Sequence, residues 1–503
     1  MYKNIMQYFE NTAEKYPDKI VFGSNDAEIT YKNFIEYARK IASVLIRSGL
    51  TKKNVAVFVD KSVNCLLGMF SSAYANACYT VIDVESPTER INTIIDTLNP
   101  ACIITDSKNK DVCLAKTGRT TLIIEDMLKE DADDTLLAEV MRKQCDTDPL
   151  YVLFTSGSTG VPKGSVICHR SVIDYALTIC KTFDINSDTV WGSQTPFYFS
   201  MSILDIFSTI VSGATFYIIP KICFIFPLSL IEFLDKNKIN SIYWVPTALN
   251  IVADFDTFGT AKPKYLKNIL FAGESMPVKQ LNYWREHLPE ALYANLYGPT
   301  EITDTCTYYI VDREFSPSDS LPIGVAFDNC DVLVIDEENN CLVEDTVSEG
   351  VLYVRGSFLG LGYYNNPEKT AEAFVQNPLN KMYPEVLYRT GDIVSYNDKG
   401  ELLFKGRKDH QIKHMGHRIE LGEIETGASA IDNVDRVCCL YDNVNSEIVL
   451  FYTGSAEEKT VRKSMKAYVP SYMVPQKCIK LSAMPINMNG KIDRIKLGND
   501  YLK

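Results

Sequence analysis

Leu150-Tyr-Val-Leu-Phe154 runs directly into Thr155-Ser-Gly-Ser-Thr-Gly-Val-Pro-Lys-Gly164. The first segment is apolar and has the length of a strand, and the second is rich in glycine and hydroxyl side chains. Glycines let backbone N–H groups approach an anion, while the hydroxyls and Lys163 add donors. The stretch therefore predicts a strand that ends in a phosphate-binding loop. A solvated turn between a strand and a helix is the alternative interpretation.

The loop does not have the spacing of the common P-loop. That motif needs a glycine, four residues and then Gly-Lys-Ser/Thr, whereas the lysine here follows Val161-Pro162. A different nucleotide chemistry is indicated.

Short apolar runs alternate with helical patterns before this loop. Residues 31–46 place apolar side chains at helical spacing, and Gly49 suits a C-terminal cap. Apolar runs of strand length follow at residues 54–60, 78–83, 101–106 and 121–125. The pattern predicts an α/β fold with layered sheets and helices and largely parallel, buried strands.

One domain boundary is predicted, near Gly406-Arg-Lys-Asp409. It divides the chain into a large N-terminal domain, residues 1–408, and a small mobile α+β C-terminal domain, residues 409–503.

Composition excludes several classes of protein. The chain has 503 residues, of which 46% are hydrophobic and 23% charged, which is typical of a soluble globular protein. The first residues contain no apolar segment after a basic one, and no run of 18 apolar residues occurs, so we expect a cytoplasmic protein without membrane insertion. The most apolar stretch, Lys221-Ile-Cys-Phe-Ile-Phe-Pro-Leu-Ser-Leu230, is interpreted as buried core or as a patch that faces a partner.

Charge and cysteine content narrow the choice further. A net charge of −13 argues against a nucleic-acid partner. The 14 cysteines are scattered without a CxxC spacing, which favours reduced thiols over disulfides or a zinc cluster.

Four further motifs follow the loop along the chain. They are Tyr297-Gly-Pro-Thr-Glu301, Tyr388-Arg-Thr-Gly-Asp392, Gly406-Arg-Lys-Asp-His-Gln-Ile-Lys-His-Met-Gly-His-Arg-Ile-Glu-Leu-Gly-Glu-Ile-Glu425 and Asn489-Gly-Lys-Ile-Asp-Arg494. Together with the loop they resemble the adenylate-forming superfamily over essentially the whole chain. The similarity is to the stand-alone, amino-acid-activating type, such as nonribosomal peptide adenylation domains and D-alanine:carrier-protein ligases.

This resemblance implies an AMP-forming acid–thiol ligase that uses ATP and Mg²⁺. The carboxylate of a small acid would attack the α-phosphorus of ATP and release pyrophosphate. The acyl group would then pass to the phosphopantetheine thiol of a separate carrier protein, since no carrier domain is recognised within these residues. Carrier proteins are usually acidic too, so a docking patch on this chain must be locally basic or apolar.

The same resemblance assigns roles to individual residues. Phosphate binding is assigned to Thr155, Ser156, Gly157, Ser158, Thr159 and Lys163. Thr300 would contact the α-phosphate, and Glu301 would hold Mg²⁺. The adenosine site would comprise Gly273, Glu274, Asn295, Leu296, Tyr297, Asp392 and Arg407, with Asp392 accepting the ribose hydroxyls.

The small domain would carry the parts that move. Lys491 would bridge the substrate carboxylate and the α-phosphate, and Asp409 would be the hinge. Residues 413–420 would line the entry of the thiol.

The acid pocket departs from the pattern of α-amino-acid activators. Ser200 stands where those enzymes have the aspartate that pairs with the substrate ammonium, which puts D-alanine in doubt, because a buried ammonium needs a counter-charge. Phe199 matches a gate beside the reacting carboxylate. The other pocket positions are Met201, Leu204, Tyr243, Leu270, Ala272, Leu296, Asp304 and Thr305.

Several functions stay open at this point. A β- or ω-amino acid could pair with Asp304, or the hydroxyl of an aryl acid could donate to it, while a side chain turned away toward backbone would leave Asp304 without a role in selectivity. A D-alanine:carrier-protein ligase and an acyl-CoA ligase are the enzymatic alternatives. A non-catalytic nucleotide-binding protein is the alternative from another class.

Overall fold

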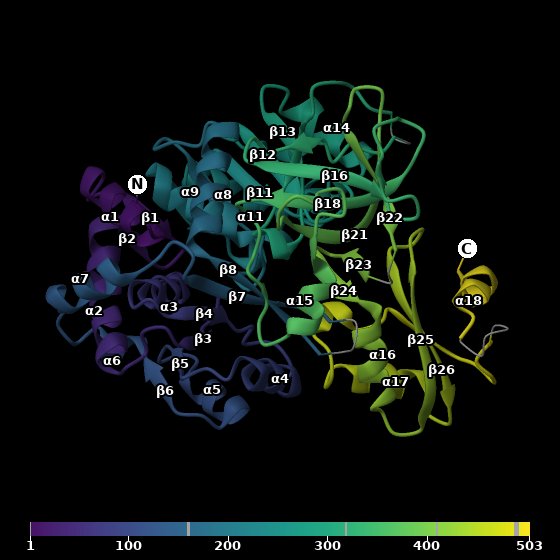
Figure 1. Cartoon of the computed structure of the whole chain (residues 1–503), viewed down its shortest axis with the longest axis horizontal. Helices are drawn as coiled ribbons and strands as arrows, with labels where there is room; N and C mark the ends of the chain where they lie inside the picture. The colour runs from purple at the N-terminus through teal and green to yellow at the C-terminus, as the bar shows by residue number, and fades with distance from the viewer. Residues whose placement is uncertain (1, 158–160, 317–318, 409–410, 487–491, 503) are drawn as a thin grey trace.

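The computed structural model describes residues 2–157, 161–316, 319–408, 411–486 and 492–502 (Figure 1). Within these residues, the part that carries the phosphate loop is a seven-stranded sheet whose central strands are parallel. Its strands lie in the order β19 (Gly362–Tyr363), β8 (Lys163–Cys168), β7 (Pro149–Thr155), β4 (Cys78–Val81), β3 (Asn54–Phe58), β5 (Cys102–Thr105) and β6 (Thr121–Ile123).

A second sheet of nine described strands holds the acid-pocket positions. It is parallel from β1 to β13 along the strand order and antiparallel at both edges. The order is β15 (Val325–Ala326), β14 (Thr307–Ile310), β13 (Leu292–Tyr297), β12 (Asn268–Ala272), β11 (Ser241–Trp244), β9 (Val190–Ser193), β10 (Thr215–Ile218), β1 (Ile20–Gly23) and β2 (Glu28–Thr30).

A third sheet is antiparallel and supplies the ribose-site positions. Its described strands are β17 (Cys341–Leu342), β16 (Cys330–Asp336), β18 (Gly350–Gly356), β21 (Val386–Tyr396), β20 (Phe374–Gln376) and β22 (Leu402–Arg407).

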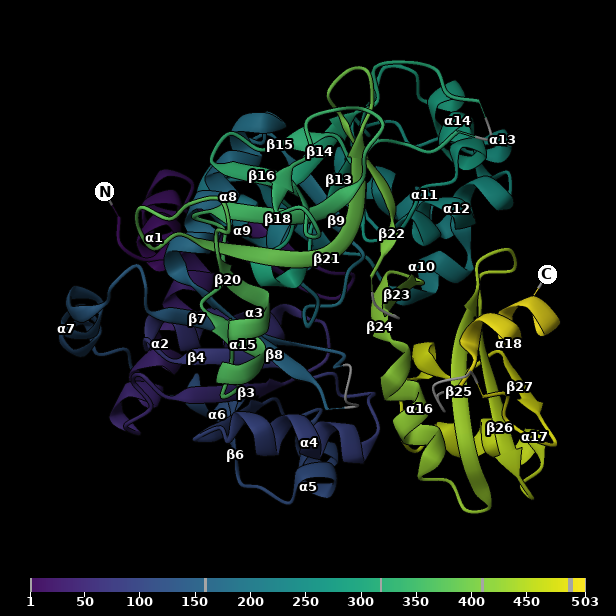
Figure 2. The same ribbon diagram turned by 45° about the vertical axis from the view of Figure 1, so that its right-hand side comes forward.

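The C-terminal part lies to one side of the three sheets (Figures 1 and 2). Its strands are the hairpin β23 (Gln411–His414) and β24 (His417–Glu420), and the sheet of β25 (Val434–Asp442), β26 (Glu447–Gly454) and β27 (Lys477–Lys480). Its helices are α16 (Leu421–Ser429), α17 (Glu458–Met465), α18 (Arg494–Tyr501) and the 3₁₀ turn η2 (Ser471–Met473).

Helices cover the sheets of the large part, as the α/β pattern of the sequence predicts. In the first half of the chain they are α1 (Ile5–Lys15), α2 (Tyr31–Arg47), α3 (Val63–Tyr74), α4 (Thr88–Leu98), α5 (Lys110–Thr117), α6 (Ile124–Met127), α7 (Asp134–Lys143), α8 (His169–Thr182), α9 (Ser202–Ser212), α10 (Lys221–Ile225), α11 (Pro227–Lys236) and α12 (Pro246–Asp254). The remainder are α13 (Thr257–Thr260), α14 (Val278–His287), the 3₁₀ turn η1 (Thr300–Ile302) and α15 (Pro367–Ala373).

The predicted fold class is confirmed, with small corrections. Helix α2 has the expected bounds within one residue, and Gly49 after it has a φ of +74°, the left-handed conformation that a C-terminal glycine favours. The strand predicted at residues 121–125 is shorter, because Ile124 begins α6. All 14 cysteines are free thiols, and most are buried.

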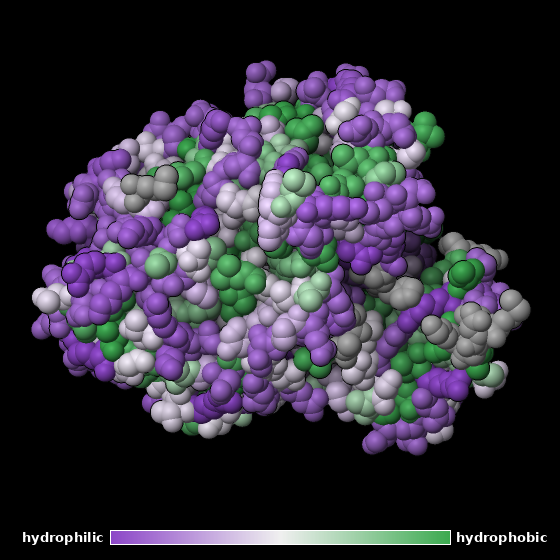
Figure 3. Space-filling view, in the orientation of Figure 1, coloured by the Kyte–Doolittle hydropathy of each residue, from purple (hydrophilic) through white to green (hydrophobic). Residues whose placement is uncertain are grey.

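Separate hydrophobic cores form on the two sides of the predicted boundary. The largest cluster contains buried residues from Ile5 to Leu402, and two other clusters contain residues from Ile419 onward. The boundary at residues 408 and 409 remains a prediction, because Asp409 lies outside the described residues. Among the residues that are described, no helix is long and apolar enough to cross a membrane. The face in Figure 3 is mostly hydrophilic, with hydrophobic residues in small groups.

We predict that Phe70→Ala destabilises the large part. Phe70 is 1% exposed, and its ring lies 5.2 Å from the ring of Phe9 and 5.7 Å from that of Phe34, between centroids. Removing a buried phenylalanine costs about 3–5 kcal/mol, because apolar contacts are lost and a cavity is left. Chemical unfolding followed by tryptophan fluorescence measures the change. Val347→Ala, at a site 90% exposed, serves as the control and should shift stability by less than about 0.5 kcal/mol. Equal stability of the two variants would contradict the packing described for Phe70.

Candidate active site

The phosphate loop joins two antiparallel strands, β7 and β8, so the alternative interpretation, a turn between a strand and a helix, is wrong. Thr155 at the end of β7 pairs in register with Lys163 at the start of β8. A Cβ atom at Gly157 would clash with the carbonyl oxygen of Val161, so the loop closes too tightly for any other residue there. Ser158 and Thr159 lie outside the described residues.

Glu301 lies at the centre of the charged groups. It sits in η1 after β13, and its carboxylate is fully buried. Arg418 pairs with its Oε2 at 2.6 Å, the Tyr363 hydroxyl donates to its Oε1 at 2.6 Å, and Lys163 Nζ lies 3.7 Å from Oε1. Burial alone would raise the pKa of Glu301, but the Arg418 and Lys163 charges and the hydrogen bonds outweigh it and lower the pKa to about 2. Glu301 is therefore an anion at any physiological pH.

The ribose-site positions also meet. Asp392 on β21 and Arg407 on β22 are register partners and form an ion pair. The hydroxyl of Tyr297 donates to the other oxygen of Asp392. Lys413 of β23 lies over the ring of Tyr297, 5.0 Å from its centroid, and burial lowers the pKa of this lysine. A ribose that binds Asp392 through its hydroxyls would have to displace the Tyr297 hydrogen bond.

Asp304 is held by tyrosine hydroxyls. Tyr175 of α8 donates to its Oδ2 at 2.9 Å and Tyr243 of β11 donates to the same atom at 3.1 Å. The side chain is 2% exposed, and the possibility that it bonds backbone instead does not apply. Burial raises the pKa of Asp304 to about 8, even though the two tyrosine hydrogen bonds oppose the shift.

A narrow cavity of about 80 Å³ connects these groups. Thr300 Oγ1 donates to Ser200 Oγ at 3.2 Å within it, and the Met201 sulfur faces Gly273. The predicted site residues that line the cavity are Thr155, Ser156, Phe199, Ser200, Met201, Ala272, Gly273, Thr300, Asp304, Thr305, Asp392 and Arg407.

The other predicted residues stand behind or beside this cavity. Asn295 donates to the backbone oxygen of Pro322 at 2.8 Å, and Glu274 accepts from the Thr247 hydroxyl at 2.7 Å. Those that do not line the cavity are Gly157, Lys163, Leu204, Tyr243, Leu270, Glu274, Asn295, Leu296, Tyr297 and Glu301. Tyr243 bonds to Asp304, which lines the cavity. Glu301 pairs with Arg418, which also lines it, and Lys163 lies beside Glu301.

The C-terminal hairpin closes over the cavity. Ser156 Oγ donates to the carbonyl oxygen of Arg418 at 2.9 Å and accepts from the Glu420 N–H at 3.0 Å. At the hairpin turn, Gly416 N–H donates to Glu274 at 2.7 Å. A Cβ atom on Gly416 would lie 2.5 Å from Val245, so the turn needs glycine for its approach as well as for its φ of +77°.

A buried ion pair also holds the C-terminal part against the large part. Arg90 of α4 pairs with Glu423 of α16, and their side chains are 9% and 6% exposed. Such a pair is costly to break, because the remaining charge stays buried without a partner. This orientation of the C-terminal part is thus held by charge as well as by hydrogen bonds.

Lys491 and Asp409 lie outside the described residues, so their predicted roles are not placed. Residues that flank the lysine, Met484 and Ile492, pack with Leu497 of α18 on one face of the β25–β26 sheet. Ile419 of β24 packs with the cluster on the other face. The present orientation therefore turns residues 411–420 toward the cavity, and the face that carries Met484 and Ile492 away from it.

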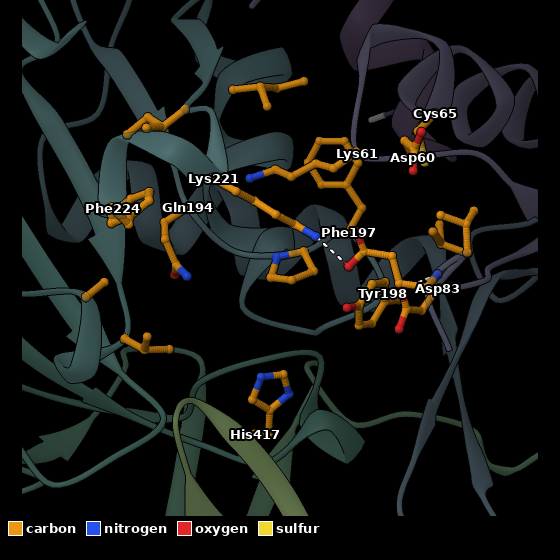
Figure 4. A pocket seen from close by; sticks show the side chains of 18 of the residues that line it. Asp60, Lys61, Cys65, Asp83, Gln194, Phe197, Tyr198, Lys221, Phe224 and His417 are labelled. Carbon is orange, nitrogen blue, oxygen red and sulfur yellow. Dashed lines mark hydrogen bonds and ion pairs between the residues drawn. The ribbon is translucent and has the colours of Figure 1, made fainter. Parts of the chain in front are cut away.

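A second cavity, of about 520 Å³, lies beside the first (Figure 4). It is lined by the large part, including Gln194, Phe197 and Lys221, and by Met415 and His417 of the hairpin. Figure 4 shows the His417 ring directed into it. Burial lowers the pKa of His417 to about 3, so its ring is neutral.

Aromatic rings separate the two cavities. The ring of His417 stacks on that of Tyr472 at 3.5 Å and meets that of Phe199 edge-on at 4.7 Å. Phe199 and Tyr472 line the first cavity, and His417 lines the second. Phe199, predicted as a gate, therefore stands at the partition between them.

Several contributing residues were not singled out from the sequence. Arg418 lies in the recognised motif of residues 406–425, and its place there was the available signal. Tyr175, Tyr363 and Arg90 gave none, because α8, β19 and α4 carry no motif that relates them to the site. Contacts between segments more than a hundred residues apart depend on the sheet order.

Comparisons with known proteins identify the class. The structure superposes on the Vibrio cholerae adenylation domain AlmE in complex with glycyl-adenosine-5'-phosphate, with a TM-score of 0.85 and 22% identity, covering 99% of this chain and 98% of that one. The fold is therefore that of adenylation domains, as the resemblance implied. A family model described as AMP-binding enzyme matches residues 9–364, and the chain belongs to that family.

Curated relatives agree with this assignment. Tyrocidine synthase 1 of Brevibacillus parabrevis is 30% identical over 98% of this chain, which spans 44% of that protein. The chain thus covers less than half the length of that relative. L-proline--[L-prolyl-carrier protein] ligase of Streptomyces coelicolor is 28% identical, and the match covers 98% of this chain and 96% of the ligase.

We predict that Arg90→Ala loosens the C-terminal part. Loss of one partner of a buried ion pair costs about 3–5 kcal/mol, which shifts the equilibrium toward an undocked hairpin. Trypsin should then cleave more rapidly at Lys413 and Arg418, since cleavage follows the open population. Mass spectrometry of timed digests locates the cuts. Arg119→Ala is the matched control, because Arg119 pairs with Asp96 on the exposed surface at 3.2 Å, where a pair contributes little. Indistinguishable digestion of the two variants would show that the ion pair does not hold the interface.

Proposed function

We propose that the chain activates a small carboxylic acid as its acyl-adenylate and transfers the acyl group to the phosphopantetheine thiol of a carrier protein. The observation that carries the proposal is the meeting, in one narrow cavity, of the phosphate-loop residues, the Asp392–Arg407 pair and an acid pocket that ends at Asp304. Intact charged groups at each of these positions argue against a non-catalytic nucleotide-binding protein.

The first half-reaction requires two anions to meet. The acid carboxylate attacks the α-phosphorus of ATP, the bond from phosphorus to the bridging oxygen breaks, and pyrophosphate leaves. Lys163, Ser156 and the loop amides would hold the phosphates, and Thr300 would donate to the α-phosphate. Lys491, on the resemblance stated above, would neutralise charge between the two reactants.

Glu301 suits a divalent cation that arrives with ATP. Mg²⁺ prefers oxygen ligands and commonly takes one or two carboxylates together with substrate phosphates. Glu301 stays ionised, because its pKa is about 2. In the present orientation Arg418 pairs with this carboxylate, so the cation and Arg418 would use Glu301 in different orientations of the C-terminal part.

The pocket favours a β- or ω-amino acid over an aryl acid. Asp304 lies deeper than Ser200 and lacks a basic partner among the described residues that bond to it. An amine farther from the carboxylate than an α-amine would supply the missing charge. The glycyl-adenylate in the AlmE complex is a small amino-acyl adenylate of the α type, so it supports small size alone.

The second cavity suits the acceptor arm. At about 520 Å³ it falls in the range of about 300–1,000 Å³ that is typical of ligand pockets. Gln194 Oε1, an acceptor, and the ring nitrogen His417 Nδ1 are buried without a partner among the described residues. A phosphopantetheine arm carries amide N–H groups that could donate to such atoms, and its thiol end would approach the first cavity beside Phe199, whose ring meets that of His417.

The first test is pyrophosphate release with MgATP and a panel of acids: β-alanine, 4-aminobutyrate, D- and L-alanine, benzoate and hydroxybenzoates. We expect β-alanine or 4-aminobutyrate to give the highest kcat/KM, because their ammonium reaches Asp304. Preference for D-alanine would support a D-alanine:carrier-protein ligase and refute the argument from Ser200. Preference for hydroxybenzoates would support the aryl-acid alternative, and release that depends on no acid would refute adenylation.

A pH profile tests how Asp304 recognises the acid. Below a pH of about 8 the free protein holds a proton on this carboxyl, because burial raises its pKa. An ammonium group pairs with the ionised form, so the KM for a β-amino acid should fall as the pH rises toward 8, by about tenfold per unit, and then level off.

Two variants complete this prediction. Asp304→Asn should abolish the pH dependence and raise the KM for the amino acid by about a hundredfold or more, as expected when one partner of a buried pair is lost. Tyr243→Phe keeps the carboxyl and removes a hydrogen bond that lowers its pKa, so the inflection should move to higher pH. A pH-independent KM in the wild type would mean that Asp304 does not meet an ammonium.

A further inference from the structure

We propose that the exposed face of α10 and the start of α11 is the docking surface for the carrier protein. This surface, the α10–α11 patch, consists of Ile222, Ile225, Phe226 and Leu228. The inference rests on the proposed function and names the surface and the class of acceptor for its second half-reaction.

The patch is apolar and open to solvent. Its four side chains are 53%, 65%, 58% and 47% exposed, in chain order. Neighbours on the same two helices, Cys223 and Leu230, are buried, so the helices already have an inner face that packs against the protein. The four exposed residues therefore do not contribute to the hydrophobic core. A contiguous apolar group of this kind on a surface marks a site of interaction.

The patch borders the cavity assigned to the acceptor arm. Lys221 and Phe224 of α10 line that cavity, and the Phe224 ring packs on Trp244 at 5.2 Å. Ile222 and Ile225 are three residues apart and share the adjacent face of the same helix. Figure 2 shows α10 on the side of the large part that faces the C-terminal part. A carrier protein bound to α10 would therefore lie next to the cavity that its phosphopantetheine arm enters.

The charges around the cavity favour a protein over coenzyme A. The nucleotide end of coenzyme A carries phosphates, which need free lysines or arginines near the entrance. Among the described lining residues, Lys221 pairs with Glu85 at 2.7 Å and Lys108 with Asp60 at 2.6 Å. Lys61 donates to the backbone oxygen of Ser193 at 3.0 Å inside the protein. These three lysines therefore already have partners, and the α10–α11 patch beside the cavity is apolar.

The net charge of the chain points the same way. At −13 the chain repels an acidic partner at long range, so an acidic carrier must be held by apolar contact. A stable dimer interface commonly uses about 20–30 residues on each side. Four apolar side chains suit a transient contact, which a carrier that leaves after each turnover requires.

The test compares Ile222→Glu/Ile225→Glu with Val347→Glu. Val347 is equally apolar and 90% exposed, and it lies between β17 and β18, so it is the matched control. Each protein is assayed for acid-dependent pyrophosphate exchange, for acyl transfer to free pantetheine and to coenzyme A, and for loading of holo-carrier proteins. The carriers are those encoded in the genome from which this chain comes, converted to the holo form with a phosphopantetheinyl transferase.

We expect the double variant to lose roughly tenfold or more in kcat/KM for the carrier, mainly through KM, as for residues that contribute most to an interface. Exchange and transfer to pantetheine should match the wild type, and Val347→Glu should be unchanged in every assay. Equal loading by wild type and double variant would overturn the proposal. So would loading of no carrier by a wild type that acylates coenzyme A efficiently.

Sedimentation velocity of the wild type and the variants distinguishes self-association of this chain from binding of a carrier protein. If the double variant turns a dimer into a monomer without changing carrier loading, the patch binds a second copy of this chain and the proposal is wrong. Absence of acid-dependent exchange in the wild type would instead refute the proposed function itself, which the exchange assay reports before any carrier is added.

Discussion

A fully buried carboxylate has to be balanced by positive charge, and the organisation of this protein depends on how Glu301 meets that requirement. Lys163 supplies part of the balance from the phosphate loop, but the short ion pair comes from Arg418 of the C-terminal part. The position of a whole domain is thereby linked to the charge state of one site. A ligand that brought its own cation to Glu301 would compete with the docked hairpin, so under the proposed function nucleotide binding and domain orientation would be parts of one equilibrium.

Burial acts on Asp304 in the acid pocket as it does on Glu301, but here the pKa of the carboxyl is raised. Asp304 is enclosed by tyrosines that give it hydrogen bonds without charge, which is why its pKa rises while that of Glu301 falls. Asp205, nearby on α9, is also buried and faces Lys61, and burial raises the pKa of this acid and lowers that of the lysine. Under the proposed function, an ammonium group on the acid would supply the positive charge that Asp304 lacks among its described hydrogen-bond partners.

The sequence predicted much of the fold, and physical reasons explain what it did not predict. Apolar runs and helical spacing identified α2, β3, β4, β5 and β7, because each of these is specified locally. The antiparallel return of β8 was missed, since a glycine-rich loop looks the same before a helix or a strand. Tyr175 and Tyr243 could not be assigned to Asp304 together, because they are brought to one oxygen atom by sheet order and by packing of α8. Roles carried over by resemblance, including those of Lys491 and Asp409, remain predictions.

The wall between the two cavities is built from both domains, since Phe199 belongs to the large part and His417 and Tyr472 to the C-terminal part. It exists only while the domains are docked. Under the proposed function, the acyl-adenylate formed in the first cavity would be a mixed anhydride, which water can hydrolyse. If the wall and the acceptor channel are assembled by one movement, the protein never has to expose that species to bulk solvent in order to meet its thiol. Domain docking would then limit wasteful hydrolysis as well as deliver the second reactant.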